Sequence, residues 1–174
     1  CIRDRGKPVN IRTVSHYGAP LRTVYFCYED EVDIIKARLT AICTQANIAP
    51  DTWCDLEAAG SLNFFCLPPE LAVQRRMDLP QPTPTFDTLE QFLAKNNIDL
   101  CVIDPLSAAA GLQNEDNAGM NHFAKLVRSM AARTNCTSLL VHHTGKATRG
   151  ALDHQASRGG SRLPGAARWV LNIA

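Results

Sequence analysis

Short apolar runs alternate along this chain with segments whose apolar residues recur every three or four positions. The runs lack a strict apolar-polar alternation, which is typical of strands buried on both faces, and they are residues 23–29, 63–67, 100–103, 138–143 and 168–174. Helical spacing is found in residues 32–46, in a segment through Leu89, Phe92 and Leu93, and in residues 117–134. Strands that alternate with helices predict an α/β fold with a mostly parallel sheet covered by helices.

The helix through Leu89 begins, by the same analysis, at a capping-box-like pair formed by Asp87 and Glu90. The prolines of residues 79–85 predict a stiff turn just before it. Residues 1–22 are polar and contain two glycines and two prolines, so we expect an irregular segment there.

Composition limits the classes of protein that fit. The 174 residues are enough for one domain with a sizeable core. A formal net charge of +1 gives no global attraction to nucleic acid or membrane, so any basic patch must be local. We find no apolar run long enough to span a bilayer and no apolar core of a signal peptide near the start.

Seven cysteines, an odd number without a CxxC pair, indicate reduced thiols rather than a disulfide framework or a zinc site. Four of them lie in apolar runs or on helix faces, where a thiol acts as a small apolar side chain; they are Cys27, Cys43, Cys66 and Cys101. This usage predicts a cytoplasmic protein.

Polar side chains follow three of the predicted strands at the point where each strand ends. Glu29 and Asp30 come after the first strand, Asp104 follows "LCVI", and a His142-His143 pair ends "LLVHH". Ligands of parallel α/β sheets lie beyond the carboxyl ends of the strands, so these groups together form a candidate site. Glu29 could act as a general base on water, Asp104 could support Mg²⁺, and a histidine could sense a γ-phosphate.

Each of these features also has a structural interpretation. An aspartate before Pro105 can simply cap a turn, and acids such as Glu29 and Asp30 favour the first turn of a helix. A histidine pair at a strand end can be structural or can bind a metal.

The stretch 145–168 is rich in glycine and small residues, and its basic residues outnumber its single acid, Asp153. The basic residues are Lys146, Arg149, Arg158, Arg162 and Arg168. A basic loop beside a phosphate site suits an arginine finger or a contact with the DNA backbone, the latter through Lys146, Arg149 and Arg162. The alternative is a solvated loop whose charges serve solubility.

Four blocks of sequence, in this order, resemble the RecA-type ATPase core of the RepA-like hexameric replicative helicases, which are AAA-family ATPases. The blocks are "VYFCYEDEVDIIKARL", "LCVIDPL…NEDNAGM", "LLVHHTGK" and "ASRGGSRLPGAARWV", and the resemblance covers residues 23–172. It implies a RecA-like P-loop NTPase sheet, ATP and Mg²⁺ as cofactors, hydrolysis at the subunit interfaces of a homo-oligomeric ring, and translocation on single-stranded DNA.

The resemblance also assigns roles to individual residues. Glu29 matches the catalytic glutamate, Asp104 the Walker B acid that holds Mg²⁺, and the histidine pair His142/His143 the sensor position. Arg158 in "SRGGS" matches the arginine finger that acts on a neighbouring subunit's nucleotide. Lys146 and Arg168 are further candidates for contacts with the nucleotide.

One element of the family's pattern is absent from these 174 residues. The phosphate-binding loop GxxxxGK[ST] does not occur, and the two Gly-Lys pairs, at Gly6 and Gly145, neither follow a predicted strand nor open a predicted helix. A βα unit with that loop needs about 30 residues before the first strand, and 22 are present. We therefore expect residues 23–174 to form a RecA-like ATPase domain that lacks the P-loop unit and, as it stands, binds ATP poorly.

Two other functions fit the same residues. One is a non-hydrolysing DNA-binding or oligomerisation module that keeps the basic loop and the interface. The other is a metal-dependent hydrolase that uses Asp104, His142, His143 and Glu29, although the sequence lacks the HxD or HxH spacing of such sites. Whether the chain itself is an ATP-hydrolysing enzyme is left open by the missing loop.

Overall fold

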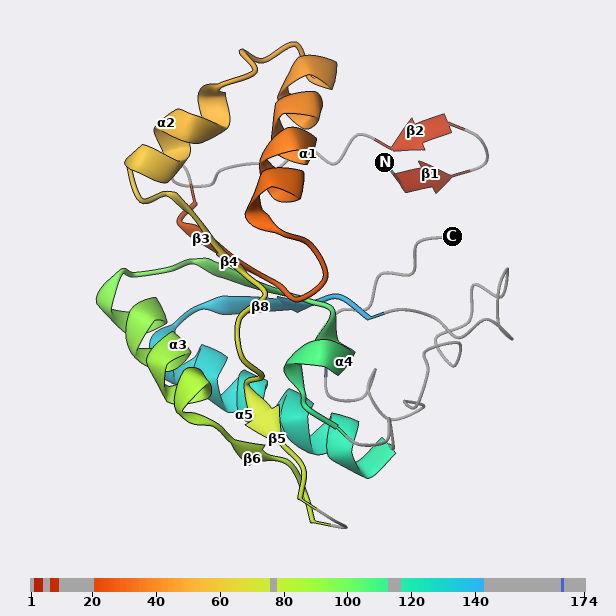
Figure 1. The fold of residues 1–174 in the computed structure, drawn as a ribbon, viewed down its shortest axis with the longest axis vertical. Coiled ribbons are helices and arrows are strands. Elements are labelled where there is room, and N and C mark those ends of the chain that lie inside the picture. Colours follow the sequence, from red (N-terminus) through yellow and green to blue (C-terminus); the bar gives the residue numbers. More distant parts are fainter. Residues whose placement is uncertain are drawn as a thin grey trace.

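The computed structural model describes residues 2–4, 7–9, 21–75, 78–112, 117–142 and 167. Its centre is a four-stranded sheet with the strand order β4-β3-β7-β8 (Figure 1). The strands are β3 (Thr23–Cys27), β4 (Leu62–Cys66), β7 (Leu100–Asp104) and β8 (Thr137–Leu140). Every neighbouring pair is parallel. The predicted α/β fold with a parallel sheet is confirmed.

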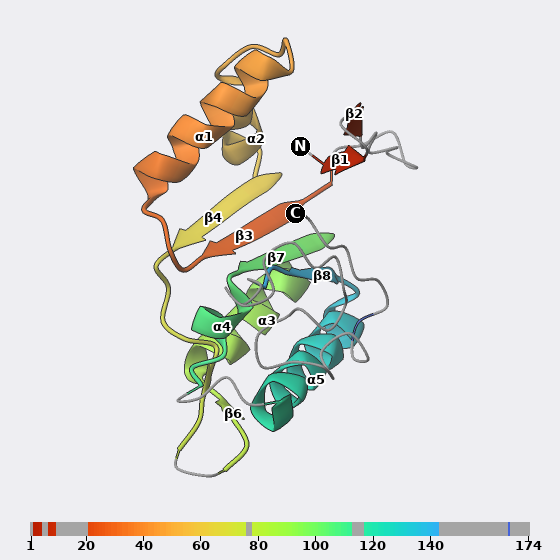
Figure 2. The same ribbon diagram turned by 90° about the vertical axis from the view of Figure 1, so that its right-hand side faces the viewer.

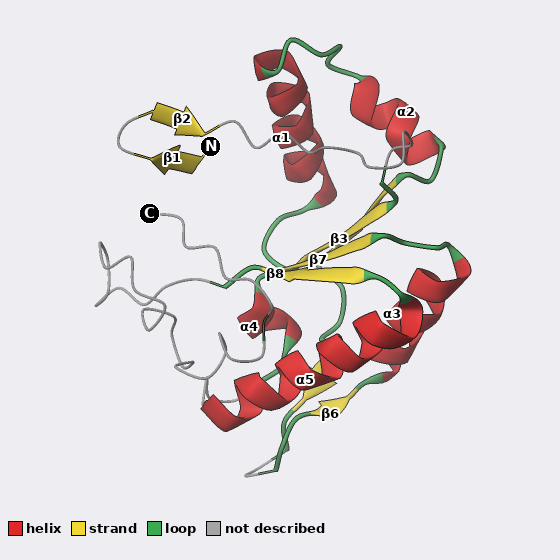
Figure 3. Cartoon of the chain, turned by 180° about the vertical axis from the view of Figure 1, so that it is seen from behind, coloured by secondary structure: helices red, strands yellow, loops and turns green. Residues whose placement is uncertain are grey.

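Helices cover both faces of the sheet (Figure 3). On one side lie α1 (Val32–Gln45) and α2 (Thr52–Ala58), which pack on each other and on β4. On the other side lie α3 (Pro84–Lys95), α4 (Leu106–Ala109) and α5 (Asn117–Thr134). This three-layer arrangement leaves the ends of the strands open to loops, and Figure 2 shows α1 and α4 departing from the edge where β3 and β7 end.

The main core lies between the sheet and the α3–α5 layer. Alternate residues of β3 and β7 point into it, as the period of two in a strand requires; they are Val24, Phe26, Cys101 and Ile103. Helix α5 meets them with the face that its sequence spacing predicts, through Met120, Phe123, Val127 and Met130. Burial of large side chains at this density supplies most of the stability of such a domain.

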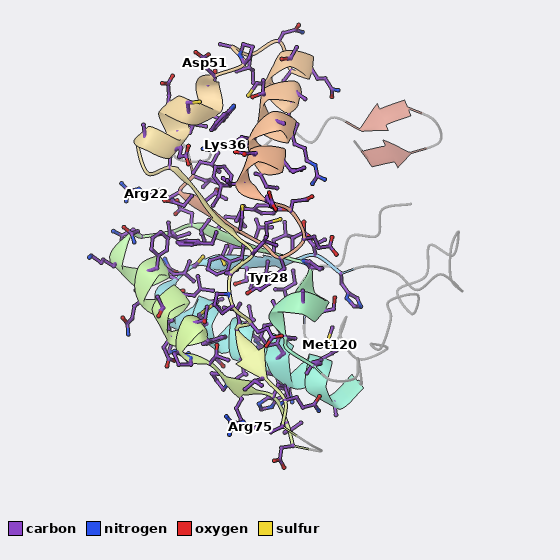
Figure 4. The ribbon with its side chains drawn as sticks, viewed as in Figure 1. Arg22, Tyr28, Lys36, Asp51, Arg75 and Met120 are labelled. Carbon is purple, nitrogen blue, oxygen red and sulfur yellow. The ribbon has the colours of Figure 1, made fainter. Side chains whose placement is uncertain are left out.

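The layer formed by α1 and α2 is more exposed than its sequence suggests. The helix α1 exists as predicted, but Ile35 is its only buried residue, while the side chain of Ile42 is 59% exposed. Trp53 of α2 donates its indole N–H to Thr40 Oγ1 over 3.0 Å, and Lys36 lies 5.7 Å from the centre of the Trp53 ring (Figure 4 labels Lys36). Polar contacts therefore carry much of the α1–α2 packing.

Helix α3 begins earlier than predicted. The expected start at Asp87 is wrong, because Thr83 is the N-cap residue and Pro84 occupies the first turn. Proline is favoured there because its missing N–H would have no partner in the helix and its fixed φ suits the helix. The Thr83 hydroxyl donates to the carbonyl of Glu70 over 2.7 Å and does not cap the helix.

Four short strands were not predicted. Residues 2–4 and 7–9, in the segment expected to be irregular, form the antiparallel pair β1 (Ile2–Asp4) and β2 (Lys7–Val9). Within the expected proline turn, β6 (Gln81–Pro82) pairs with β5 (Ala72–Val73). The expected strand at 168–174 lies outside the described residues.

Loop 71–74 is held against the end of α4. The Leu71 N–H donates to the Ala109 carbonyl over 2.9 Å, and the Gln74 N–H donates to the Gly111 carbonyl over 3.3 Å. Gly111 has a φ of +54°, and a Cβ atom there would lie 2.1 Å from the Ala72 carbonyl oxygen. Only glycine permits this approach without displacement of the backbone.

Two further properties follow from the described residues. The six cysteines among them are free thiols, as predicted. No helix in this part of the chain is both long enough and apolar enough to cross a bilayer.

Candidate functional site

The strand order brings three of the predicted site residues to one edge of the sheet. Asp104 is the last residue of β7, which lies between β3 and β8. Glu29 comes two residues after the end of β3, and His142 two residues after the end of β8. The other predicted site residues lie outside the described part of the chain; they are His143, Lys146, Arg149, Arg158, Arg162 and Arg168.

The Asp104 carboxylate is held by a tyrosine of the neighbouring strand. Tyr25 donates its hydroxyl to Asp104 Oδ2 over 2.5 Å. The two residues meet because Tyr25 pairs with Val102 in the parallel register, so Asp104 follows two residues later on the same face. Burial, and then the hydrogen bond to Asp104, raises the pKa of Tyr25 well above its ordinary value. The phenol therefore keeps its proton, and can donate it to this hydrogen bond, up to a higher pH than a free tyrosine.

Backbone hydrogen bonds continue the strand pairing past the side chains of the site. The Tyr28 N–H donates to the Asp104 carbonyl, and the Leu106 N–H donates to the Val141 carbonyl. The peptide bond between Asp104 and Pro105 is cis. This backbone pairing fixes where Asp104 lies relative to the loops that follow β3 and β8.

The acids after β3 have different surroundings. Asp30 forms an ion pair with Arg38 of α1, and its N–H donates to the Cys27 sulfur over 3.3 Å. The Glu31 carbonyl accepts the N–H groups of Ile34 and Ile35 as the N-terminal cap of α1. Glu29 is exposed to solvent. Of Glu29 and Asp30, which the sequence named together, Asp30 thus has a structural role through its ion pair with Arg38, whereas the side chain of Glu29 is exposed.

The side chains at this edge of the sheet could supply one carboxylate ligand to Mg²⁺. Mg²⁺ is bound through one or two carboxylates together with phosphate oxygens and water, and Asp104 supplies one such carboxylate at the strand end. Among the described residues no group of three or more His, Cys, Asp or Glu could hold a metal ion by itself.

The structure adds Tyr25 and Arg38 to the residues that the sequence suggested. Tyr25 lies two residues before the end of its strand, on the face that carries Asp104, and only the strand register reveals the contact. Arg38 follows Asp30 by eight residues, and their ion pair joins α1 to the loop that precedes it. The signal that the sequence offered for the contact between Tyr25 and Asp104 was a tyrosine within one predicted strand and an aspartate at the end of another.

The comparison with protein families agrees with this geometry. Residues 1–149 match the family model described as an AAA domain, a range that includes Glu29, Asp104 and His142 and ends before Arg158. The chain matches no curated protein. The match covers most of the chain, and the parallel sheet with its acid-ended central strand is the arrangement that a RecA-like nucleotide-binding core requires. The chain therefore belongs to the AAA domain family of P-loop NTPases and is an AAA-type ATPase domain.

Proposed function

We propose that this domain is the RecA-like motor core of a RepA-like replicative DNA helicase, which hydrolyses ATP at subunit interfaces and moves along single-stranded DNA. The observation that carries the proposal is the position of Asp104 at the end of β7, between the strands that lead to Glu29 and His142. This is where a Walker B acid, a general base and a phosphate sensor would be needed around one nucleotide.

The roles follow from the surroundings of each side chain. The solvent-exposed carboxylate of Glu29 can take a proton from an attacking water. Asp104, oriented by the Tyr25 hydroxyl, would hold Mg²⁺ together with ATP phosphates. Mg²⁺ supplies charge neutralisation at the phosphates when it is bound. His142 is half-buried beside the same edge, at a position from which it could respond to the γ-phosphate.

The remaining roles rest on the sequence alone. His143 shares the sensor position, and Lys146 and Arg168 are candidates for nucleotide contacts. Lys146, Arg149 and Arg162 would contact the DNA backbone, and Arg158 would reach the nucleotide of a neighbouring subunit in a homo-oligomeric ring. We place this protein, with residues 23–174 as its ATPase domain, in the cytoplasm.

A second candidate is favoured by the basic stretch 145–168, which could contact the DNA backbone without hydrolysis. A non-hydrolysing module for DNA binding or oligomerisation would not need the phosphate loop. It would bind single-stranded DNA in a salt-dependent manner whether or not ATP is present. ATP hydrolysis stimulated by single-stranded DNA therefore distinguishes the helicase core from this module.

The test uses a protein in which a βα unit with a GxxxxGK[ST] loop precedes residue 1. In it, Glu29→Gln should abolish turnover while ATP still binds, because a general base acts on water and does not hold the nucleotide. We expect a loss of about 10²-fold or more in kcat, measured as phosphate release, with an unchanged Kd for ATP.

Glu31→Gln is the matched control, since Glu31 is an equally exposed acid in the same loop whose contribution to α1 comes from its backbone carbonyl. This variant should keep the normal rate. Normal hydrolysis by the Glu29→Gln protein would show that Glu29 is not the base. Absence of DNA stimulation in the parent protein would favour the non-hydrolysing module.

A further inference from the structure

Two cysteines stand side by side on neighbouring strands at the edge described above. Cys27 and Cys66 are the last residues of β3 and β4, and they are direct partners in the parallel register. Paired residues of parallel strands point to the same face. Neighbouring strands lie about 4.8 Å apart, which falls within the range of about 4.4–6.8 Å that separates the Cα atoms of a disulfide.

The two thiols lie on the same face of the sheet, in different surroundings. Burial first, and then the charges of Cys27 and Asp30, raise the pKa of Cys66, whereas Lys36 lowers it. The Cys27 sulfur also accepts the Asp30 N–H over 3.3 Å.

One of the two thiols can be reached from solvent. Cys66 is half-buried and lines an open surface depression of about 410 Å³ together with Glu31, Val32, Phe64 and Leu67. Cys27, its partner in the register, is only 2% exposed. This arrangement gives a small oxidant access to Cys66 first and leaves Cys27 to react from within the protein.

We propose that Cys27 and Cys66 form a redox-modification site, at which a hydroperoxide oxidises the two thiols to a disulfide between β3 and β4. The Cys66 sulfur attacks the peroxide O–O bond, which gives a sulfenic acid and water. The Cys27 sulfur then attacks the Cys66 sulfur, the S–S bond forms as the S–O bond breaks, and a second water leaves with the remaining proton. Two thiols lose two electrons and two protons, and one hydrogen peroxide becomes two waters.

The disulfide would link Cys27, at the end of β3, to Cys66, at the end of β4. Cys27 lies two positions before Glu29 and is the register partner of Asp104 on the other side. The inference does not depend on the proposed function, because the disulfide can be detected without nucleotide or DNA.

A second pair of cysteines serves as an internal comparison. Cys101 and Cys136 both lie in the main core, with Cys101 fully buried. Burial raises the pKa of Cys101 to about 12 and that of Cys136 to about 11. Thiols that a small oxidant cannot reach react with it slowly, and Cys66, whose pKa is also raised, differs from these two in its access to solvent. The structure thus predicts oxidation at one cysteine pair and not at the other.

The experiment treats the reduced, folded 174-residue chain with a small molar excess of hydrogen peroxide and then alkylates the remaining thiols. Cleavage with trypsin and with a protease that cuts before aspartate places each of the seven cysteines on its own peptide. Mass spectrometry should find peptides 23–29 and 55–75 joined, with two hydrogens fewer than their sum, and separated again by dithiothreitol. This link should exceed any link through Cys101 or Cys136 by about tenfold or more.

Three variants test the assignment. Cys66→Ser should remove the link without disturbing the core, and Cys27→Ser should remove it too, with circular dichroism to confirm that each is folded. Cys54→Ser, which alters an exposed thiol of α2, should leave the link unchanged. Links from Cys66 to Cys43 or Cys54 in its place, or Cys66 recovered only as unlinked oxidised acid, would overturn the proposal.

Discussion

The hydrogen bond between Tyr25 and Asp104 affects both side chains. The phenol orients the carboxylate, and the carboxylate in turn keeps the phenol protonated. Loss of this bond should lower the stability measurably, because a half-buried carboxylate oxygen of Asp104 would then lack its hydrogen-bond donor.

Tyr25→Phe should therefore lower the free energy of unfolding at pH 7 by about 1 kcal/mol, measured by urea denaturation. Tyr28→Phe is the control, because the Tyr28 hydroxyl makes a longer bond of 3.4 Å to the Pro69 carbonyl and does not touch Asp104. We expect a smaller loss for it. An equal loss in both variants would mean that the bond to Asp104 contributes nothing particular.

The raised pKa of Tyr25 adds a dependence on pH. The folded chain keeps the phenol proton at pH values where the unfolded chain has lost it, so stability is fully present below about pH 10, the ordinary tyrosine value, and falls as pH rises above it. One such group contributes a slope of at most about 1.4 kcal/mol per pH unit. The decline in stability above pH 10 should be shallower in Tyr25→Phe than in the parent chain; parallel curves would contradict this.

Gly111 supports the loop that packs β5 against α4. Gly111→Ala places a Cβ atom 2.1 Å from the Ala72 carbonyl oxygen at a positive φ, so the backbone must shift. We expect a loss of about 2–3 kcal/mol or more in the free energy of unfolding. Gly60→Ala is the matched control, since Gly60 has a φ of +68° but open space around it. It should lose only about 1 kcal/mol, and equal losses would exclude the contact with Ala72 as the cause.

Helices and strands whose apolar residues recur at a clear spacing could be predicted from the sequence, and those without such a spacing could not. Helix α5 buries the face that its spacing defines, and β3 and β7 appear within a few residues of their apolar runs. The start of α3 was misplaced because Asp87 and Glu90 resemble a capping box, while Pro84 in the first turn is the signal that the structure follows. Helix α2 buries no residue and β5 is two residues long, so neither has a recurring apolar pattern that could be recognised in the sequence.

The two helical layers should differ in stability. Ile35→Ala removes the buried side chain of α1 and should cost about 2–5 kcal/mol, whereas Ile42→Ala, at a site 59% exposed, should cost less than about 0.5 kcal/mol. Amide hydrogen exchange should be faster in α1 than in α5, because α5 packs against the main core along its length. Equal protection of the two helices would show that α1 is covered by contacts beyond those described.

For the whole molecule, the sequence predicted that acids and histidines would meet at one sheet edge but could not give the strand order. Parallel strands place their carboxyl ends together, which is a general rule. The position of Asp104 between β3 and β8, however, depends on how β7 inserts into the sheet, and the contact with Tyr25 depends on the register. Both arise from long-range packing that no local pattern encodes.

The last prediction concerns cooperation between copies of the chain and rests on the proposed function. Arg158 is followed directly by two glycines in "ASRGGS", which lets the backbone approach a partner closely. A guanidinium that neutralises charge on the transferred phosphoryl accelerates hydrolysis on the order of 10³-fold or more. In the protein extended with the phosphate loop, Arg158→Ala should keep nucleotide binding and lose ATPase activity.

Mixing Arg158→Ala with Glu29→Gln then tests whether the arginine acts across an interface. Each homogeneous assembly lacks one required group at every site. In mixed assemblies, a site formed by the Glu29 of an Arg158→Ala subunit and the Arg158 of a Glu29→Gln neighbour is complete, so part of the activity should return. Mixing Arg158→Ala with a Glu29→Gln/Arg158→Ala double variant is the control, because no site in these assemblies has an intact Arg158, so no activity should return. If mixing restores nothing while light scattering confirms mixed assemblies, Arg158 does not act on a neighbouring subunit.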